Sequence, residues 1–156
     1  MLNSTENIMP NKLERIKVSG FKSIRELDIE LRDLNVLIGA NGSGKSNFIS
    51  LFELVHAIVN KGLQVYSGRY LVESLLYYGE KITKTLDIRL YFENGIYEIS
   101  LIPSHDANLI FNKEAIHITL ENGEEYHKSF HGHLETKLDE FRKLIPSLDT
   151  YLGDAI

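Results

Sequence analysis

The sequence predicts an α/β protein in which a parallel or mixed sheet carries a glycine-rich loop and an antiparallel β meander forms a subdomain beside it. Three observations lead to this fold class. The apolar, strand-like run Leu34–Ile38 stops at a glycine-rich loop. A strongly apolar helical pattern begins directly after that loop. From residue 84 onward, apolar and polar residues alternate and Asn-Gly dipeptides separate the runs, which is typical of antiparallel hairpins.

The chain ahead of the loop is expected to form two strands. Residues 1–11 carry no periodicity and are predicted to be a disordered leader. Residues 12–19 predict a first strand, and a turn-like link over 20–24 follows it. Alternation of apolar and acidic residues over 26–31 then predicts a second, half-buried strand, which is expected to pair antiparallel with the first.

The loop itself has the spacing G-x-x-x-x-G-K-[ST] between a strand and a helix. Glycines permit backbone conformations that other residues avoid, so successive N–H groups can converge on one anion. Lys45 is expected to reach the β- and γ-phosphates, and the Ser46 hydroxyl is expected to complete the shell of a Mg²⁺ ion. The sequence therefore predicts a nucleoside triphosphate site whose residues are Gly39, Asn41, Gly42, Ser43, Gly44, Lys45, Ser46 and Asn47.

The helix after the loop is expected to run from Gly44 to Asn60. Only a narrow polar stripe interrupts its apolar residues, so we expect it to be buried nearly all round. Gly62 is its predicted C-terminal stop. A shorter helix is expected over 70–78, and an amphipathic helix is expected from Leu134 to Ile145.

The meander is predicted from residues 84–130. Asn94–Gly95 and Asn122–Gly123 are the dipeptides that two-residue hairpin turns favour. Residues 109–111 are expected to add a further short strand.

Composition and charge restrict the classes of function. The chain has 156 residues, no cysteine and a formal net charge of −5. Disulfides and zinc-thiolate sites are thus excluded, and an acidic balance argues against a dominant DNA-binding surface. No stretch has the build of a signal peptide or reaches the ~18 apolar residues of a membrane span, so a cytoplasmic location is expected.

One element that P-loop enzymes need is missing after the loop. Such enzymes need a strand of about four apolar residues that ends in Asp. The nearest match is Leu90–Glu93, and the Asn-Gly turn behind it predicts a hairpin arm instead. The guanine-specific patterns N-K-x-D and D-x-x-G are also absent, which argues against a GTPase.

The words G-F-K-S-I at 20–24 and L-N-V-L-I-G-A-N-G-S-G-K-S-N at 34–47 closely resemble the ATP-binding-cassette (ABC-type) ATPases of the RecF, SMC and OLD-like group. These are AAA-labelled P-loop ATPases of bacterial defence and DNA-repair systems, and the similarity covers residues 12–121. The resemblance implies ATP and Mg²⁺ as cofactors and the coupling of ATP binding and hydrolysis to DNA repair or phage defence. It also implies that the first two strands line the adenine side.

The resemblance implies that residues 12–156 are the N-terminal lobe of such an ATPase domain. Residues 12–62 would be the nucleotide-binding core and 84–130 the antiparallel β subdomain. The signature motif, the Walker B strand and the switch histidine of the family belong to a C-terminal lobe that this sequence lacks, so turnover by this chain alone is not expected. The expected partners are that C-terminal lobe or a second nucleotide-binding domain in a homodimer, with an effector nuclease or DNA reached through the missing region. A membrane is not an expected partner.

Two other classes of function stay open. The chain is alternatively a non-catalytic module that uses nucleotide binding to dock a protein partner. A small-molecule kinase would need arginines in a lid, for which Arg69 is the available candidate. Lys22 and Arg25 are either solvated turn charges or contacts to a phosphate or ribose.

Several weaker signals have an ordinary structural interpretation. Gln64 is predicted to be a surface residue rather than a Mg²⁺ sensor. Tyr77 and Tyr78 are predicted to pack in the core rather than to stack on a base. The three histidines of residues 127–133 are predicted to lie in an exposed loop rather than to bind a metal.

Overall fold

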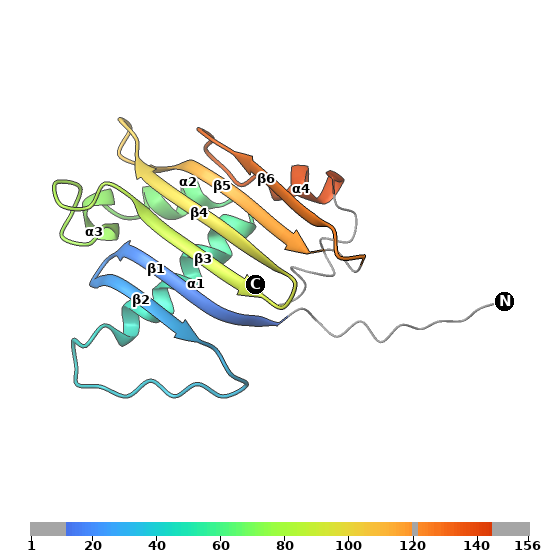
Figure 1. The fold of residues 1–156 in the computed structure, drawn as a ribbon. Helices are drawn as coiled ribbons and strands as arrows, with labels where there is room; N and C mark the ends of the chain where they lie inside the picture. The colour runs from blue at the N-terminus through green and yellow to red at the C-terminus, as the bar shows by residue number, and fades with distance from the viewer. Residues whose placement is uncertain (1–11, 120–121, 145–156) are drawn as a thin grey trace.

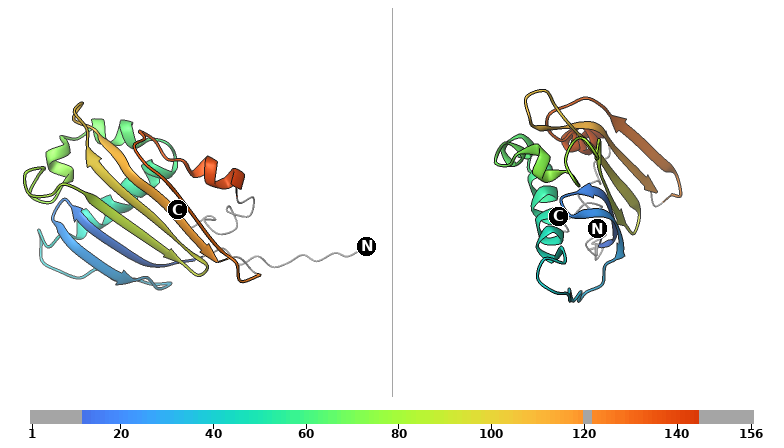
Figure 2. Two further views of the ribbon diagram at one scale, coloured as in Figure 1. Left: turned by 45° about the horizontal axis from the view of Figure 1, so that its top comes forward. Right: turned by 90° about the vertical axis from the view of Figure 1, so that its left-hand side faces the viewer.

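The computed structural model describes residues 12–119 and 122–144. Its elements are β1 (Leu13–Phe21), β2 (Ile24–Glu30), α1 (Lys45–Val59), α2 (Leu63–Gly68), α3 (Val72–Leu75), β3 (Leu86–Phe92), β4 (Gly95–Pro103), β5 (Leu109–Thr119), β6 (Glu125–Phe130) and α4 (Leu138–Leu144). The strands form one sheet in the order β2-β1-β3-β4-β5-β6 (Figure 1). Every neighbouring pair runs antiparallel. Helix α1 lies diagonally across one face of this sheet (Figure 2).

Strands β1 and β2 form the antiparallel hairpin that the sequence predicts. The turn between them is tighter than expected, because only Lys22 and Ser23 separate the strands, and Lys22 takes a φ of 48°. The other edge of β1 pairs with β3. The meander is therefore a continuation of the first hairpin and not a separate sheet, which corrects that part of the expected fold class. The division into residues 12–62 and 84–130 stays a prediction.

The four strands from β3 to β6 form the predicted meander. Strands β3 and β4 form the predicted hairpin, but its two turn residues are Glu93 and Asn94, because Gly95 pairs with Phe92 as the first residue of β4. Glycine at 95 instead allows a close backbone approach: a Cβ there would lie 2.7 Å from the carbonyl oxygen of His117. The short strand expected at 109–111 is the beginning of the longer strand β5. Asn122–Gly123 precedes β6, and Gly123 has a φ of 81°.

The core lies between the sheet and the helices. Ile88 and Leu90 of β3 are fully buried, as are Leu51 and Leu54 of α1. Burial of one such side chain contributes about 1.5–3 kcal/mol. The alternate residues of the strands form a charged outer face, on which Arg89 of β3 pairs with a neighbouring glutamate. The sheet is thus covered by helices on one face and charged on the other.

Helix α1 is amphipathic, whereas the sequence suggested burial on nearly all sides. Ile49 is 58% exposed and Phe52 is 38% exposed. The buried residues, which face the sheet, are Leu51, Leu54, Val55 and Ile58. The prediction was wrong because it assumed a neighbour on each side of the helix, and the described chain packs against one side.

The segment after α1 differs from the expectation in two ways. The chain turns through Lys61, which has a φ of 55°, while Gly62 precedes the unpredicted helix α2. The helix expected over 70–78 is limited to the single turn α3. Leu76 instead forms a β-bridge with Phe21 at the end of β1, so the backbone leaves the helix to extend the sheet. Tyr78 has a φ of 53° and is 77% exposed, so the expectation that it packs in the core is wrong.

The last helix, α4, begins at Leu138 rather than at Leu134. Leu138 and Phe141 are buried, and the ring of Phe141 lies 5.0 Å from that of Phe130 on β6. Residue Ile145 of the predicted helix lies outside the described residues.

The apolar run Leu34–Ile38 is not a strand, which corrects the expectation of a parallel or mixed sheet. It belongs to a long loop that leads from β2 to the start of α1 (Figure 1). Leu34, Val36 and Ile38 are 80%, 70% and 91% exposed. A continuous apolar run suits a strand that is covered on both faces and hydrogen-bonded to neighbours. In residues 12–119 and 122–144 no strand pairs with this run, so it stays irregular.

Candidate nucleotide-binding site

The glycine-rich loop closes around the amino group of Lys45. The Nζ atom donates to the carbonyl oxygens of Gly39 at 2.6 Å and Ala40 at 2.8 Å, and to the Ser43 hydroxyl at 3.3 Å. The Ser43 N–H donates to the carbonyl oxygen of Ala40 at 3.2 Å, which tightens the same turn. The loop therefore holds its one cation on its inner side, where a polyphosphate would need it.

Glycine is needed at specific positions of this loop. Gly42 and Gly44 have φ values of 83° and 95°, a region that L-residues with a Cβ avoid. A Cβ on Gly39 would lie 2.5 Å from the Ser43 hydroxyl, so a larger residue would clash with the loop's own turn. Asn41 and Ser43 complete the loop and are exposed. Glycine thus supplies the positive φ values at positions 42 and 44, and at position 39 it leaves room for the Ser43 side chain.

Helix α1 begins where the loop ends. Its N-cap is Gly44, which has no side chain to cap the helix, and no acidic residue occupies the first turn. The first turn of a helix leaves N–H groups unpaired and carries the positive end of the helix dipole, which favours an anion. Ser46, the second residue of α1, is exposed. These residues fit a Mg²⁺-bound triphosphate: the loop amides and Lys45 would contact phosphate oxygens, and the Ser46 hydroxyl would be a Mg²⁺ ligand.

Asn47 connects the loop to the turn between β1 and β2. Its Nδ2 atom donates to the Ser23 hydroxyl at 2.7 Å. The Ser23 hydroxyl also lies 3.2 Å from the position that a Cβ on Gly44 would occupy. Residues 20–24 and 39–47 belong to the two segments that carry the family resemblance. The structure thus brings them side by side at one end of α1.

Lys22 is half-buried in the turn between β1 and β2, next to the Ser23 that contacts Asn47, whereas Arg25 is an exposed residue of β2. The Lys22 ammonium lies 5.2 Å from the centre of the Tyr70 ring and 5.3 Å from that of Phe21. Partial burial lowers the pKa of Lys22 from its ordinary value, and the charge of Glu53 on α1 opposes this shift. Lys22 is therefore not the fully solvated turn charge that was one of its two interpretations.

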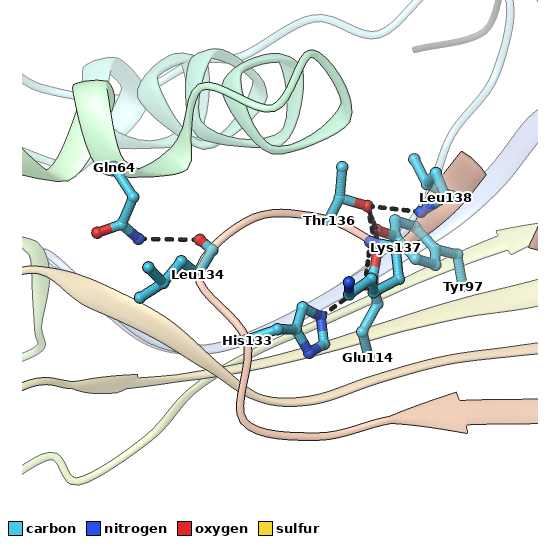
Figure 3. A network of polar contacts seen from close by, with 8 residues as sticks. All are labelled: Gln64, Tyr97, Glu114, His133, Leu134, Thr136, Lys137 and Leu138. Carbon is cyan, nitrogen blue, oxygen red and sulfur yellow. Dashed lines mark hydrogen bonds and ion pairs between the residues drawn. The ribbon is translucent and has the colours of Figure 1, made fainter. Parts of the chain in front are cut away.

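Gln64 is half-buried and is not directed toward the loop. Its Nε2 atom donates to the carbonyl oxygens of Leu109 at 2.8 Å and Leu134 at 2.9 Å (Figure 3). The carboxylate of Glu135 in turn accepts hydrogen bonds from the backbone N–H groups of Leu63 and Gln64 at the start of α2. Gln64 thus joins α2 to β5 and to the segment before α4.

The three histidines of residues 127–133 do not share an exposed loop. His127 lies on β6, where its ring stacks on His117 of β5 at 4.1 Å. His131 is exposed, whereas the side chain of His133 is only 9% exposed. The His133 ring stacks on Phe111 and its Nε2 atom lies 2.8 Å from the Glu114 carboxylate. The prediction for His133 was wrong because its ring is buried against Phe111 and Glu114, which lie far from it in the sequence.

Glu114 is the centre of a buried polar cluster that the sequence interpretation missed. Its carboxylate is fully buried and contacts Tyr97, His133, Thr136 and the backbone N–H of Lys137 (Figure 3). A bulge in the pairing of β4 and β5 changes which residues of β5 face inward. The available signal was alternation: Glu114 is in phase with the inward residues Ile116 and Ile118. The cluster fixes the fold between β5 and α4.

The loop, the uncapped helix and the lysine together define the class of protein as a P-loop nucleotide-binding protein. The family model described as "AAA ATPase domain" matches residues 12–154, so the chain belongs to the AAA ATPase domain family, a family of ATP-binding proteins. This membership confirms the family resemblance and the P-loop ATPase class of the fold. A comparison with curated proteins finds no match.

Among solved structures, the chain is similar to one from a study of ATP-driven dimerization and DNA-stimulated activation of SMC ATPases. The identity is 18%, the match covers 92% of this chain and 81% of that chain, and the TM-score is 0.43. Within the described ranges, no helix combines the length and the apolar character needed to span a bilayer.

Proposed function

We propose that residues 39–47 bind ATP with Mg²⁺, and that the chain is the Walker A-bearing part of a RecF/SMC/OLD-like ATPase. The observation that carries the proposal is the placement of Lys45 Nζ within 2.6–2.8 Å of two loop carbonyl oxygens, directly before an uncapped helix N-terminus. A phosphate group offers Lys45 a stronger, charge-assisted partner than these carbonyls. Nucleotide binding would therefore exchange the contacts of Lys45 without moving its backbone.

We further propose that a C-terminal ATPase lobe completes this chain. The support comes from the exposed run Leu34–Ile38, which has the composition of a strand but no partner strand in the described residues. Large apolar side chains in a contiguous exposed run are typical of interaction surfaces. Ile49 and Phe52 on α1 extend the apolar exposure close to the loop. A strand of the C-terminal lobe that pairs with Leu34–Ile38 would cover both groups of residues.

Hydrolysis is proposed as a property of the completed ATPase. The carboxylate that orients the attacking water in P-loop enzymes has no counterpart after Ser46 in this sequence. In the proposal, the C-terminal lobe supplies it, two completed domains pair as a homodimer, and the resulting motion serves DNA repair or phage defence through DNA or an effector nuclease. A cytoplasmic location stays a prediction.

The test is calorimetric titration of the chain with ATP in the presence of Mg²⁺. Lys45→Ala should weaken ATP binding about 10- to 100-fold, the effect of removing a hydrogen-bonded charge. Ser46→Ala should weaken binding with Mg²⁺ present and change it little in EDTA. Lys84→Ala, which removes an exposed lysine between α3 and β3, is the matched control and should bind as the parent does. If Lys45→Ala binds ATP as tightly as the parent, the proposal is wrong.

The non-catalytic alternative is distinguished by a second measurement. Phosphate release should appear when the chain is mixed with the C-terminal lobe and ATP, and Lys45→Ala should abolish it. Tight ATP binding without any phosphate release in that mixture would favour the interaction module.

A further inference from the structure

Strand β6 forms one edge of the sheet, and the proposed function does not involve it. In the sheet order β6 pairs with β5, and residues 12–119 and 122–144 supply no further strand beside it (Figure 1). Unpaired N–H and C=O groups along such an edge are a template on which another strand can pair. The six residues of β6 are enough for that pairing, so the edge needs some protection.

Lys128 occupies a position of β6 that faces the core side of the sheet. It lies directly opposite Ile116 of β5, which is 1% exposed. It also alternates with Tyr126 and Phe130, which pack against the core. An interior strand fills the same positions with buried hydrophobic side chains, which on β4 are Tyr97, Ile99 and Leu101.

The Lys128 side chain is exposed although its position faces inward. Its ammonium group lies 5.6 Å from the centre of the Phe130 ring, a cation–π distance. The ring of Phe130 in turn lies 5.0 Å from that of Phe141 on α4. The inner side of β6 is thus covered by α4 at Phe130 and reached by solvent at Lys128.

The edge strand at the other side of the sheet, β2, has a similar arrangement. Arg25 is exposed and alternates with Leu27 and Ile29. These two residues lie opposite Val18 and Ile16 of β1, which are buried. Each of the two edge strands of the described sheet therefore has a cation at a core-facing position.

A strand that paired with the open edge of β6 would place its own core-facing side chains beside Lys128. The ammonium group would then lose water. The buried carboxylate of β5, Glu114, already accepts hydrogen bonds from its own partners and gives Lys128 no new acceptor. Burial of a charge without a compensating partner is strongly unfavourable, and core-facing charges are one means by which natural edge strands avoid pairing.

We propose that Lys128 keeps the β6 edge closed, so that a second copy of this chain does not extend the sheet through β6. The inference goes beyond the proposed function and does not depend on nucleotide binding. It depends on the charge of residue 128 and on the side of the sheet that this residue faces.

The experiment measures self-association by sedimentation velocity over a concentration series. Lys128→Ile should strengthen self-association at least about tenfold over the parent, because the added strand no longer desolvates a charge. Lys128→Arg keeps the charge and should associate as the parent does. Glu125→Ile is the matched control, because it places the same side chain on the same strand but in phase with His127, on the outer face. Lys128→Ile also takes the net charge from −5 to −6, which opposes association and so does not explain a gain.

Amide hydrogen exchange locates the contact. The exposed run Leu34–Ile38 is common to all variants, so any association through it is present in the parent as well. In Lys128→Ile the amides of β6 should exchange more slowly as the protein concentration rises, because pairing protects them. If Lys128→Ile associates no more than the parent, or if Glu125→Ile associates as strongly, the proposal is wrong.

A second pair of variants decides the question if Lys128→Ile does not fold. Lys128→Gln removes the charge and stays polar, and it should associate more strongly than Lys128→Arg. Equal association of these two variants would contradict the proposal.

Discussion

Replacing Glu114 by glutamine should cost the protein a large part of its stability. The carboxylate accepts hydrogen bonds from the Tyr97 hydroxyl and the Thr136 hydroxyl, each at 2.5 Å, and from the N–H of Lys137 at 2.7 Å. The fourth contact is His133 Nε2 at 2.8 Å. Glutamine has nearly the same shape, so no cavity forms. Its amide group, however, presents hydrogens to two of these four donors.

The magnitude follows from the donors that lose their acceptor. An amide nitrogen that faces Tyr97 and Thr136 forces both hydroxyls to accept instead of donate, and one that faces Lys137 leaves that N–H without an acceptor; such losses cost about 1–3 kcal/mol each. Loss of the negative charge removes a desolvation penalty and offsets part of this cost. We therefore expect the free energy of unfolding to fall by about 3 kcal/mol, a drop in melting temperature of roughly 6–12 °C for a chain of this length.

The assay is urea and thermal unfolding followed by circular dichroism. Glu125→Gln on β6 is the control, because that side chain is exposed, and it should unfold with the parent. The affinity of the folded Glu114→Gln variant for ATP should stay that of the parent, since the cluster lies between β5 and α4 and shares no residue with the loop. A Glu114→Gln variant within about 0.5 kcal/mol of the parent would refute the account of the cluster.

Two further predictions concern the outer surface. Arg15 donates two hydrogen bonds to Asp28 and holds the pKa of that carboxyl at about 2, below its ordinary value of 3.8. The pKa of Asp28 is lower in the folded than in the unfolded chain, so the ion pair stabilises the fold above about pH 4. This stabilisation is lost as the pH falls through about 2. The difference in melting temperature between the parent and Asp28→Asn should therefore shrink over that window. Leu34→Ser and Ile38→Ser should each change the free energy of unfolding of this chain by less than about 0.5 kcal/mol because both side chains are exposed, yet they should weaken association with the C-terminal lobe in a pull-down. Unchanged association would exclude this run as the contact surface.

The features that the sequence predicts well are those encoded over short distances. The helix after the loop is placed within one residue at each end, and the first meander hairpin is found with its turn one residue ahead of the Asn94–Gly95 dipeptide. Turn chemistry and helix starts depend on neighbouring residues, so one sequence suffices for them. The conformation of the loop itself follows from three glycines and a lysine in fixed spacing.

The features that the sequence does not predict depend on distant neighbours. Leu34–Ile38 has strand composition, but a strand needs hydrogen-bonding partners that the described residues do not supply. The register of β1 with β3, which joins the described strands into one sheet, carries no local signal. His133 becomes buried because Glu114, 19 residues earlier, accepts its hydrogen bond. Pairings of this kind are set by packing after the elements have formed.

The central claim is that the main-chain amides of residues 39–47 hold a triphosphate. The most direct measurement is a ¹H–¹⁵N NMR titration of the chain with tripolyphosphate and then ATP in the presence of Mg²⁺. The account predicts that both ligands shift the amide signals of Gly42, Gly44, Lys45 and Ser46 most strongly. A folded protein in which either ligand binds while those four amide signals stay unchanged would contradict it.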